Sequence, residues 1–187
     1  MSPFSEGLDP VFALLARLGL GGLLLSAAIH KGRDLARFVD TVRDYRILPD
    51  RLSTFGAWAL ALGEAAVALS LLVPRLDPMG PLGAIALLGL YTAAIGFNLM
   101  RGRRHIDCGC AGFGLQRQTL NGWLPIRNTL LAGLPLVLLM APANGRLLGW
   151  VDFLSIGAGL AIGALLWLSA HELARARSIA SALGETP

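Results

Sequence analysis

The sequence predicts an all-α integral membrane protein, a bundle of about five transmembrane helices with a surface amphipathic helix in its first long connection. Hydrophobic residues make up 55 % of the 187 residues and charged residues 15 %, against about 25 % charged residues in an average soluble domain. The mean hydropathy is +0.62. The apolar residues are gathered in five long runs, and the length suits a single transmembrane domain, 1–187.

The five runs cover roughly residues 11–30, 54–73, 79–100, 124–141 and 147–170. Each is close to the about 20 residues that a helix needs to cross the hydrocarbon core. Only helices or closed barrels satisfy their backbone hydrogen bonds there, and these runs lack the alternating pattern of barrel strands. We expect Pro135 to kink the fourth helix, and Trp123 and Trp150 to lie at the membrane interfaces.

The breaks between the runs predict how the helices are connected. Residues 74–78 and 142–146 are short and rich in Pro and Gly, which indicates tight hairpins. The connections 31–53 and 101–123 are longer, and with five spans both lie on the same membrane face as the C-terminal tail. The first nine residues contain no Lys or Arg, so we expect the first run to be a retained span and not a cleaved signal peptide.

An amphipathic pattern occupies the first long connection. Phe38, Val42 and Tyr45 recur at helical spacing, with charged residues between them. This pattern is typical of a helix that lies on the membrane surface. We expect this helix to end at Pro49.

The distribution of Lys and Arg predicts an orientation. Twelve lie in the two long connections and the tail, and only Arg75 and Arg146 lie in the connections on the opposite face. The positive-inside rule therefore places the long connections in the cytoplasm. Basic residues beside apolar runs serve anionic lipid headgroups, so we expect membrane lipids, and no nucleic acid, as partners.

The two cysteines of the chain stand together as Cys108-Gly109-Cys110 in the second long connection. Gly109 can supply the bend that a small disulfide ring needs, and such a strained ring is readily reduced. The arginines and His105 just upstream favour thiolates, whereas Asp107 opposes them. We therefore favour redox exchange. Two alternatives remain: unremarkable loop cysteines, or a metal site, although four ligands within six residues are cramped for zinc.

Two predicted spans each have a lone ionisable residue in their interior, where a charge costs about 2.5–3.5 kcal/mol and is usually functional. Arg17 is in the first span and Glu64 in the second. Their depths differ by roughly 4.5 Å of helix rise, so we expect an ion pair between them, with a proton or ligand site at Glu64 as the alternative.

Polar residues also end two spans near the cysteines. His30 and Lys31 end the first span, and Asn98 and Arg101 end the third. Such residues usually extend toward the interface, where their polar ends reach water. The alternative is a polar contact with a quinone ring or with the cysteine loop.

Several of these residues together resemble the MauE family of methylamine utilisation proteins, which is related to DoxX-like membrane proteins. The similarity runs from about Arg17 to about Leu139, and the Cys-Gly-Cys loop is its most specific element. The other matching residues are Lys31, Phe38, Tyr45-Arg46-Ile47-Leu48-Pro49, Glu64, Asp107, Phe113-Gly114 and Arg127-Asn128. The resemblance implies a four-helix core, to which this chain adds a fifth helix, and Ala111-Gly112 departs from the tighter spacing expected in the family.

The resemblance implies a membrane protein for the maturation of methylamine dehydrogenase, placed in the cell inner membrane. Its role would be to support disulfide formation in the small subunit of that enzyme, with the thioredoxin-like protein MauD as partner. Cys108 and Cys110 would be the exchanging pair, with Gly109, His105, Asp107, Glu64, Arg17 and Lys31 in support. Electrons would then pass to a membrane quinone or to the partner, because the chain has no second cysteine pair.

Two other functions fit the same sequence. One is a non-enzymatic membrane scaffold that recruits the thioredoxin-like partner through the amphipathic segment. The other is a small metal- or solute-handling membrane protein. The implied client forms its disulfides outside the cytoplasm, whereas the charge count places the cysteines inside, so the two lines of reasoning predict opposite faces.

Overall fold

The computed structural model is described for residues 7–73, 76–103, 106–109, 120–141 and 145–184. In this part of the chain all regular elements are helices: α1 (Pro10–Arg33), α2 (Leu35–Asp44), α3 (Asp50–Leu72), α4 (Met79–Met100), α5 (Trp123–Met140) and α6 (Trp150–Gly184). Five of them, all but α2, are long and apolar enough to cross a membrane. This confirms the predicted fold class of an all-α multi-pass membrane protein.

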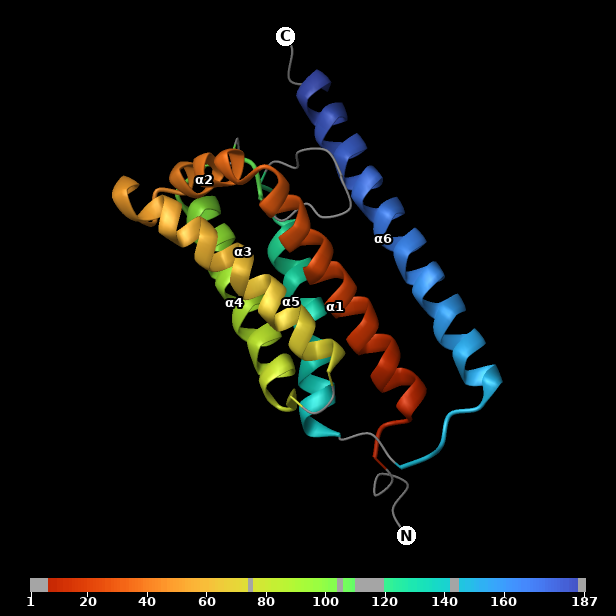
Figure 1. Cartoon of the computed structure of the whole chain (residues 1–187). Helices are drawn as coiled ribbons and strands as arrows, with labels where there is room; N and C mark the ends of the chain where they lie inside the picture. Colours follow the sequence, from red (N-terminus) through yellow and green to blue (C-terminus); the bar gives the residue numbers. More distant parts are fainter. Residues whose placement is uncertain (1–6, 74–75, 104–105, 110–119, 142–144, 185–187) are drawn as a thin grey trace.

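The five spans run alternately up and down, and the two ends of the chain lie at opposite ends of the bundle (Figure 1). We call the end that carries α2 and residues 101–103 and 106–109 the loop face. The opposite end, with residues 7–9, 76–78 and 145–149, is the turn face. Both long connections therefore lie on the same face, as predicted.

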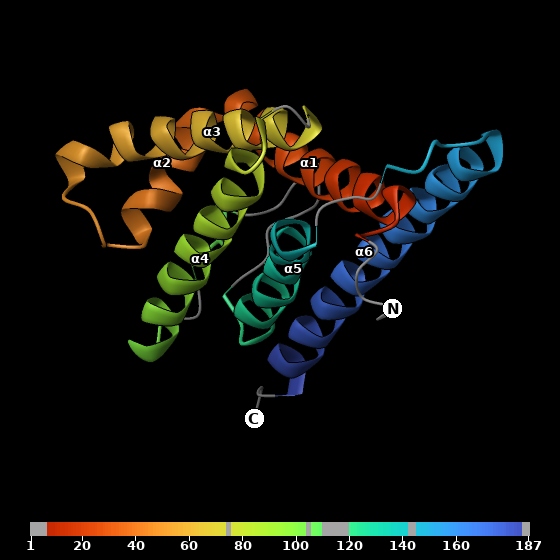
Figure 2. The same cartoon turned by 90° about the horizontal axis from the view of Figure 1, so that it is seen from below.

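The helices of the bundle pack against one another to different extents. α1 packs mainly on α3, and α4 mainly on α5, while α3 also contacts α4. Figure 2 shows α1, α2 and α3 along one side of the bundle, α4 and α5 on the other, and α6 beside α1. Only 6 % of the spanning part of α6 is buried, so α6 is a peripheral helix of the bundle.

Local sequence signals explain several helix ends. The Asp9 carboxylate accepts a hydrogen bond from Val11 N at 2.8 Å, and Pro10 occupies the first helical position, a combination that favours a helix start. Asp34 caps α2 by accepting from Arg37 N at 3.2 Å. Trp123 and Trp150 are the first residues of α5 and α6, at opposite faces, as interfacial tryptophans are expected to be.

The amphipathic helix in the first connection is confirmed, but its predicted end is wrong. α2 ends at Asp44, and Arg46 has a left-handed φ of 47°, a conformation that breaks a right-handed helix. Pro49 instead precedes the first residue of α3, Asp50, which starts one turn earlier than the apolar run at 54 suggests. A proline fits at a helix start because it lacks the N–H that a helix interior requires.

Two of the buried apolar clusters lie at different depths of the bundle. The central cluster joins α1, α3 and α4 and consists of Leu20, Leu24, Ala68, Leu71, Ala84 and Leu88. The loop cluster lies under the cysteine loop and consists of Ile95, Cys108, Leu120 and Leu124. The functional side chains lie between and above these clusters.

Candidate functional site

The Cys108–Gly109 turn lies directly on α2. Gly109 has a left-handed φ of +66°, and a Cβ at this position would lie 3.0 Å from Thr41 Cγ2 and 3.2 Å from Phe38 Cε2. A side chain here would therefore be strained and crowded, so glycine is needed for both backbone conformation and close approach. The predicted bend at Gly109 is present in the structure.

Two hydrogen bonds fix the turn on its support. Tyr45 Oη donates to the carbonyl oxygen of Cys108 at 3.1 Å. Asp107 Oδ1 accepts from Gly109 N at 3.3 Å, the local bond by which aspartate shapes a turn. Leu120 N donates to Ile106 O at 3.1 Å, which brings together the two ends of the connection that carries the cysteines.

Cys108 is 5 % exposed and belongs to the loop cluster. Its side chain therefore points into the bundle and away from solvent. Cys110 and His105 lie outside the described residues. Of the four metal ligands considered from the sequence, the structure describes only Asp107 and Cys108, and in the described part of the chain no three His, Cys, Asp or Glu side chains gather as a metal site.

Below the turn, a charged cluster is buried within the membrane-spanning part of the bundle. Lys31 Nζ of α1 donates to Glu64 Oε1 of α3. Tyr91 Oη of α4 donates to the same carboxylate oxygen at 2.6 Å and accepts from Lys31 Nζ at 3.2 Å. Glu64 is 1 % exposed, so this carboxylate is stabilised by a lysine and a hydroxyl where water cannot reach it.

The predicted ion pair between Arg17 and Glu64 is therefore wrong. Arg17 instead pairs with Asp77, in the connection between α3 and α4, with Nη1 at 3.0 Å from Oδ1. The prediction compared depths along the helix axes and overlooked Lys31, whose long side chain reaches inward from the end of α1. The expectation that Lys31 extends toward the interface is wrong for the same reason.

Phe38 connects the buried charges to the cysteine turn. Lys31 Nζ lies 5.0 Å from the centre of the Phe38 ring and 4.9 Å from that of Tyr91, distances at which a cation is attracted to a ring face. The same Phe38 ring is in contact distance of Gly109. Lys31 is thus one aromatic ring away from the turn that carries Cys108.

Two buried asparagines complete the polar interior. Asn98 of α4 donates to Ala94 O at 3.1 Å, and Asn128 of α5 accepts from Arg127 Nη2 at 3.1 Å. Among the described residues three buried side-chain atoms have no hydrogen-bond partner: Glu64 Oε2, Asn98 Oδ1 and Asn128 Nδ2. Leaving such buried atoms without a hydrogen bond costs free energy, so a further hydrogen-bonding group at these positions would stabilise the protein.

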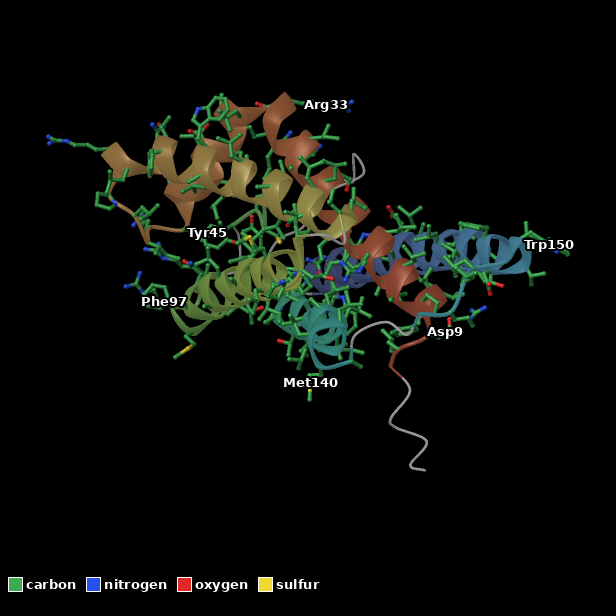
Figure 3. The ribbon with its side chains drawn as sticks, turned by 60° about the horizontal axis from the view of Figure 1, so that its bottom comes forward. Asp9, Arg33, Tyr45, Phe97, Met140 and Trp150 are labelled. Atoms are coloured by element: carbon green, nitrogen blue, oxygen red, sulfur yellow. The ribbon has the colours of Figure 1, made fainter. Side chains whose placement is uncertain are left out.

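The turn face carries a separate ion cluster. Arg146 donates to Asp9 Oδ1 at 3.1 Å and to Asp152 Oδ2 at 2.9 Å. The hydrogen bond from the Val11 N–H, followed by that from Arg146, lowers the pKa of Asp9. The hydrogen bonds to Asp152 and then Asp9 raise the pKa of Arg146. This cluster ties the start of α1 to the start of α6, which Figure 3 marks by Asp9 and Trp150.

Two contributors to the site were not predicted from the sequence. Thr41 and Tyr91 contact the turn and the buried carboxylate, respectively. Tyr91 carried a signal that could have found it, because it is a hydroxyl-bearing side chain in the middle of an apolar span. Thr41 carried none, because its role depends on where the distant Gly109 lies.

Comparison with known proteins identifies the family. The family model described as methylamine utilisation protein MauE matches residues 9–142. The chain is 38 % identical to the methylamine utilization protein MauE of Paracoccus denitrificans over 170 residues, which cover 89 % of each chain. It is 34 % identical to the protein of the same name from Paracoccus versutus, over 86 % of this chain and 84 % of that protein.

A third relative, MauE of Methylophilus methylotrophus, is 36 % identical over 72 % of this chain and 70 % of its own length. No solved structure matches the chain. The alignment with the Paracoccus denitrificans protein covers so much of the chain that it reaches into α6, whereas the family model ends before α6 begins. The chain belongs to the MauE family of methylamine utilisation proteins.

Proposed function

We propose that this chain supports disulfide formation in the small subunit of methylamine dehydrogenase by thiol–disulfide exchange at Cys108 and Cys110. It acts in the cell inner membrane, with the thioredoxin-like protein MauD as its partner. The observation that carries the proposal is the packing of the turn against α2. The left-handed Gly109 lies against Phe38, and the Cys108 carbonyl accepts a hydrogen bond from Tyr45. These contacts give the residue between the two cysteines a defined conformation.

The exchange proceeds by two consecutive attacks of client thiolates, and its electrons and protons balance. A thiolate of the client attacks the disulfide between Cys108 and Cys110, so that a mixed disulfide forms and one cysteine leaves as thiolate. A second client thiolate then attacks the mixed disulfide, forming the client disulfide and releasing the other cysteine. The client has lost two electrons and two protons, and Cys108 and Cys110 are now a dithiol. An oxidant, either a membrane quinone or a disulfide of the partner, must then restore the pair.

Burial distinguishes the roles of the two cysteines. Cys108 is nearly inaccessible behind the loop cluster, so the proposal assigns the first encounter with a protein partner to Cys110. Cys108 becomes reactive when the turn leaves the face formed by Phe38, Thr41 and Tyr45.

Substitution of each cysteine tests the proposal. Cys108→Ser and Cys110→Ser are expected to leave the protein in the membrane at normal levels while client disulfides fail to form. The measurement is the number of disulfides per small subunit, by alkylation and mass spectrometry. Ala111→Ser, beside the pair, is the matched control and is expected to retain full activity. Normal client disulfides in either cysteine variant would contradict the exchange.

The membrane face of the turn has its own test. The client forms its disulfides outside the cytoplasm, so the proposal expects an impermeant maleimide to label Cys110 of the Cys108→Ser variant in intact cells. Labelling only after the cells are broken would place the turn in the cytoplasm, as the distribution of Lys and Arg favours, and would contradict direct exchange with the client.

A scaffold role through α2 is the second candidate, favoured by the exposed charges of that helix. The pair between Arg43 and Asp40 has side chains that are both well exposed to solvent. In this case Arg43→Glu would abolish client maturation and the cysteine variants would not, which is the reverse of the outcome expected for exchange.

A further inference from the structure

The buried atoms without partners define a candidate binding site that the cysteines do not occupy. Glu64 Oε2 is a hydrogen-bond acceptor and Asn128 Nδ2 is a donor, and neither has a partner among the described residues. Glu64 is 1 % exposed and Asn128 2 %. Two side chains buried to this degree are not solvated, so a bound group with matching chemistry would remove the cost of both unpaired atoms.

The packing of α4 against α5 places Asn128 at the depth of the charged cluster. Tyr91 lies between the central and loop clusters on α4, and Asn128 lies between them on α5. Leu88 of α4 belongs to the central cluster and Leu131 of α5 packs against it, whereas Ile95 of α4 and Leu124 of α5 both belong to the loop cluster. Because α4 and α5 run antiparallel, Tyr91 and Asn128 face the same layer.

One polar residue from each of four spans therefore lies at about this depth, a set that we call the polar layer: Lys31 of α1, Glu64 of α3, Tyr91 of α4 and Asn128 of α5. Apolar clusters lie above and below it. Lys31 Nζ and Tyr91 Oη are already engaged with Glu64 Oε1. The two atoms left to a ligand are therefore one acceptor and one donor.

We propose that the polar layer binds the head group of a membrane quinone and binds its reduced hydroquinone form more tightly than its oxidised form. A hydroquinone hydroxyl can donate to Glu64 Oε2 while a head-group oxygen accepts from Asn128 Nδ2. An oxidised quinone offers acceptors only, so it leaves the carboxylate oxygen unpaired. A ring between two apolar clusters is also in the environment that lipid-soluble molecules favour.

The polar layer lies close to the cysteine turn, so it can take part in the proposed function. This part of the inference rests on that function. Lys31 contacts Phe38, and Phe38 contacts Gly109, so the layer begins one ring away from the cysteine turn. Reoxidation of the pair breaks two S–H bonds and forms one S–S bond. The two electrons and two protons convert the two carbonyls of the quinone to hydroxyls. Tighter binding of the product form favours this direction.

The test uses the full chain in lipid nanodiscs with decylubiquinone and decylubiquinol as probes, and follows quenching of tryptophan fluorescence. Asn128→Leu is expected to weaken decylubiquinol binding about fivefold, the effect of one lost hydrogen bond. Asn98→Leu is the matched control, because Asn98 is also a buried asparagine with one unpartnered atom but lies two turns along α4 from Tyr91, outside the layer. It is expected to bind decylubiquinol as the unmodified chain does.

Glu64→Gln gives a second readout, which is the preference for the reduced probe. The unmodified chain is expected to bind decylubiquinol more tightly than decylubiquinone, and the variant to lose this difference. Asn128→Leu keeps the inference testable if Glu64→Gln fails to fold. Equal effects of the two asparagine variants, or no saturable binding by the unmodified chain, would overturn the inference and leave internal water as the partner of these atoms.

The binding assay is repeated in a Cys108→Ser, Cys110→Ser background, where exchange cannot occur. Retained binding there supports the site independently of the cysteines. Normal client disulfides from a chain that binds neither probe would overturn the quinone site and leave the proposed exchange standing, with the partner protein as oxidant.

Discussion

Tyr45 Oη donates a hydrogen bond to the backbone carbonyl oxygen of Cys108 across 3.1 Å. Tyr45 follows α2 directly, and Cys108 lies 63 positions later, in the connection between α4 and α5. Figure 3 labels Tyr45 and, near the end of α4, Phe97 on the same side of the molecule, away from Asp9 and Trp150. This bond makes the first long connection a support for the second.

Removing that bond is expected to release the turn. Tyr45→Phe loses a hydrogen bond with a net worth of about 1 kcal/mol, which corresponds to roughly a fivefold rise in the population of the released turn. The measurement is the rate at which a small thiol reagent modifies Cys108. Thr129→Val, which removes a hydroxyl that donates to Pro125 O on α5, is the control. Equal rates for Tyr45→Phe and the unmodified chain would show that the bond does not hold the turn.

A pair of glycines separates backbone strain from crowding at the turn. Gly109 and Gly102 both have a left-handed φ, but a Cβ at Gly102 would meet nothing within 4 Å. Alanine costs about 1–2 kcal/mol at either position because of its backbone conformation. Gly109→Ala is expected to cost more and to expose Cys108, because the new methyl group also presses on Thr41 and Phe38. The measurements are the free energy of unfolding and the Cys108 modification rate. Equal losses of unfolding free energy in the two variants would contradict the close packing of Gly109 against α2.

The Lys31–Glu64 and Arg17–Asp77 ion pairs are expected to differ in the free energy that their removal costs. Lys31→Met leaves the Glu64 carboxylate buried without its cation, a change that typically costs about 3–5 kcal/mol. Arg17→Met leaves Asp77, whose side chain is 41 % exposed, in contact with water, and is expected to cost about 1 kcal/mol or less. The free energy of unfolding in detergent is the measurement.

The double variant Lys31→Met, Glu64→Leu provides the control for the buried pair, since replacing both charges by apolar groups is often close to neutral. A stability near that of the unmodified chain is expected. Equal losses for Lys31→Met and Arg17→Met would contradict the burial of the Lys31–Glu64 pair.

The sequence was sufficient for the parts of the fold that depend on hydrophobicity along the chain. Each apolar run became a spanning helix, and the spacing of Phe38 and Tyr45 correctly indicated the amphipathic helix. It failed where the outcome depends on the direction of a side chain. Lys31 is at a helix end and could extend outward or inward, and only the position of Glu64 and Tyr91 on neighbouring helices decides between the two.

The candidate site was predictable only in its centre. The bend at Gly109 follows from the chemistry of glycine between two cysteines. The partners of the turn do not, because Thr41 and Tyr45 meet it through tertiary packing across many residues. The depth of Asn128 relative to Tyr91 likewise depends on the register of α5 against α4, which hydrophobic periodicity leaves undetermined.

Acid is expected to weaken the cluster on the turn face. The pKa of Asp9 is lowered in the folded protein, first by the Val11 N–H and then by Arg146. A lowered pKa adds stability above the unfolded value, and this contribution is lost as the pH falls through the folded value. The measurement is the difference in unfolding free energy between the unmodified chain and Asp9→Asn, followed from about pH 6 to about pH 2.

Two groups lower the pKa of Asp9, and removing either the carboxylate or one of these groups is expected to change the acid-dependent step differently. Asp9→Asn is expected to make the acid-dependent step smaller, and Arg146→Gln to leave part of the Asp9 contribution in place, because the Val11 N–H remains. A step of unchanged size in Asp9→Asn would show that other carboxylates cause it.

The most direct test of thiol–disulfide exchange is the redox state of Cys108 and Cys110 in living cells, read by differential alkylation and mass spectrometry. We predict that the pair is partly reduced while the small subunit of methylamine dehydrogenase is being made, and becomes a Cys108–Cys110 disulfide when synthesis of that subunit is stopped. Two cysteines that remain thiols under both conditions would contradict the proposed function.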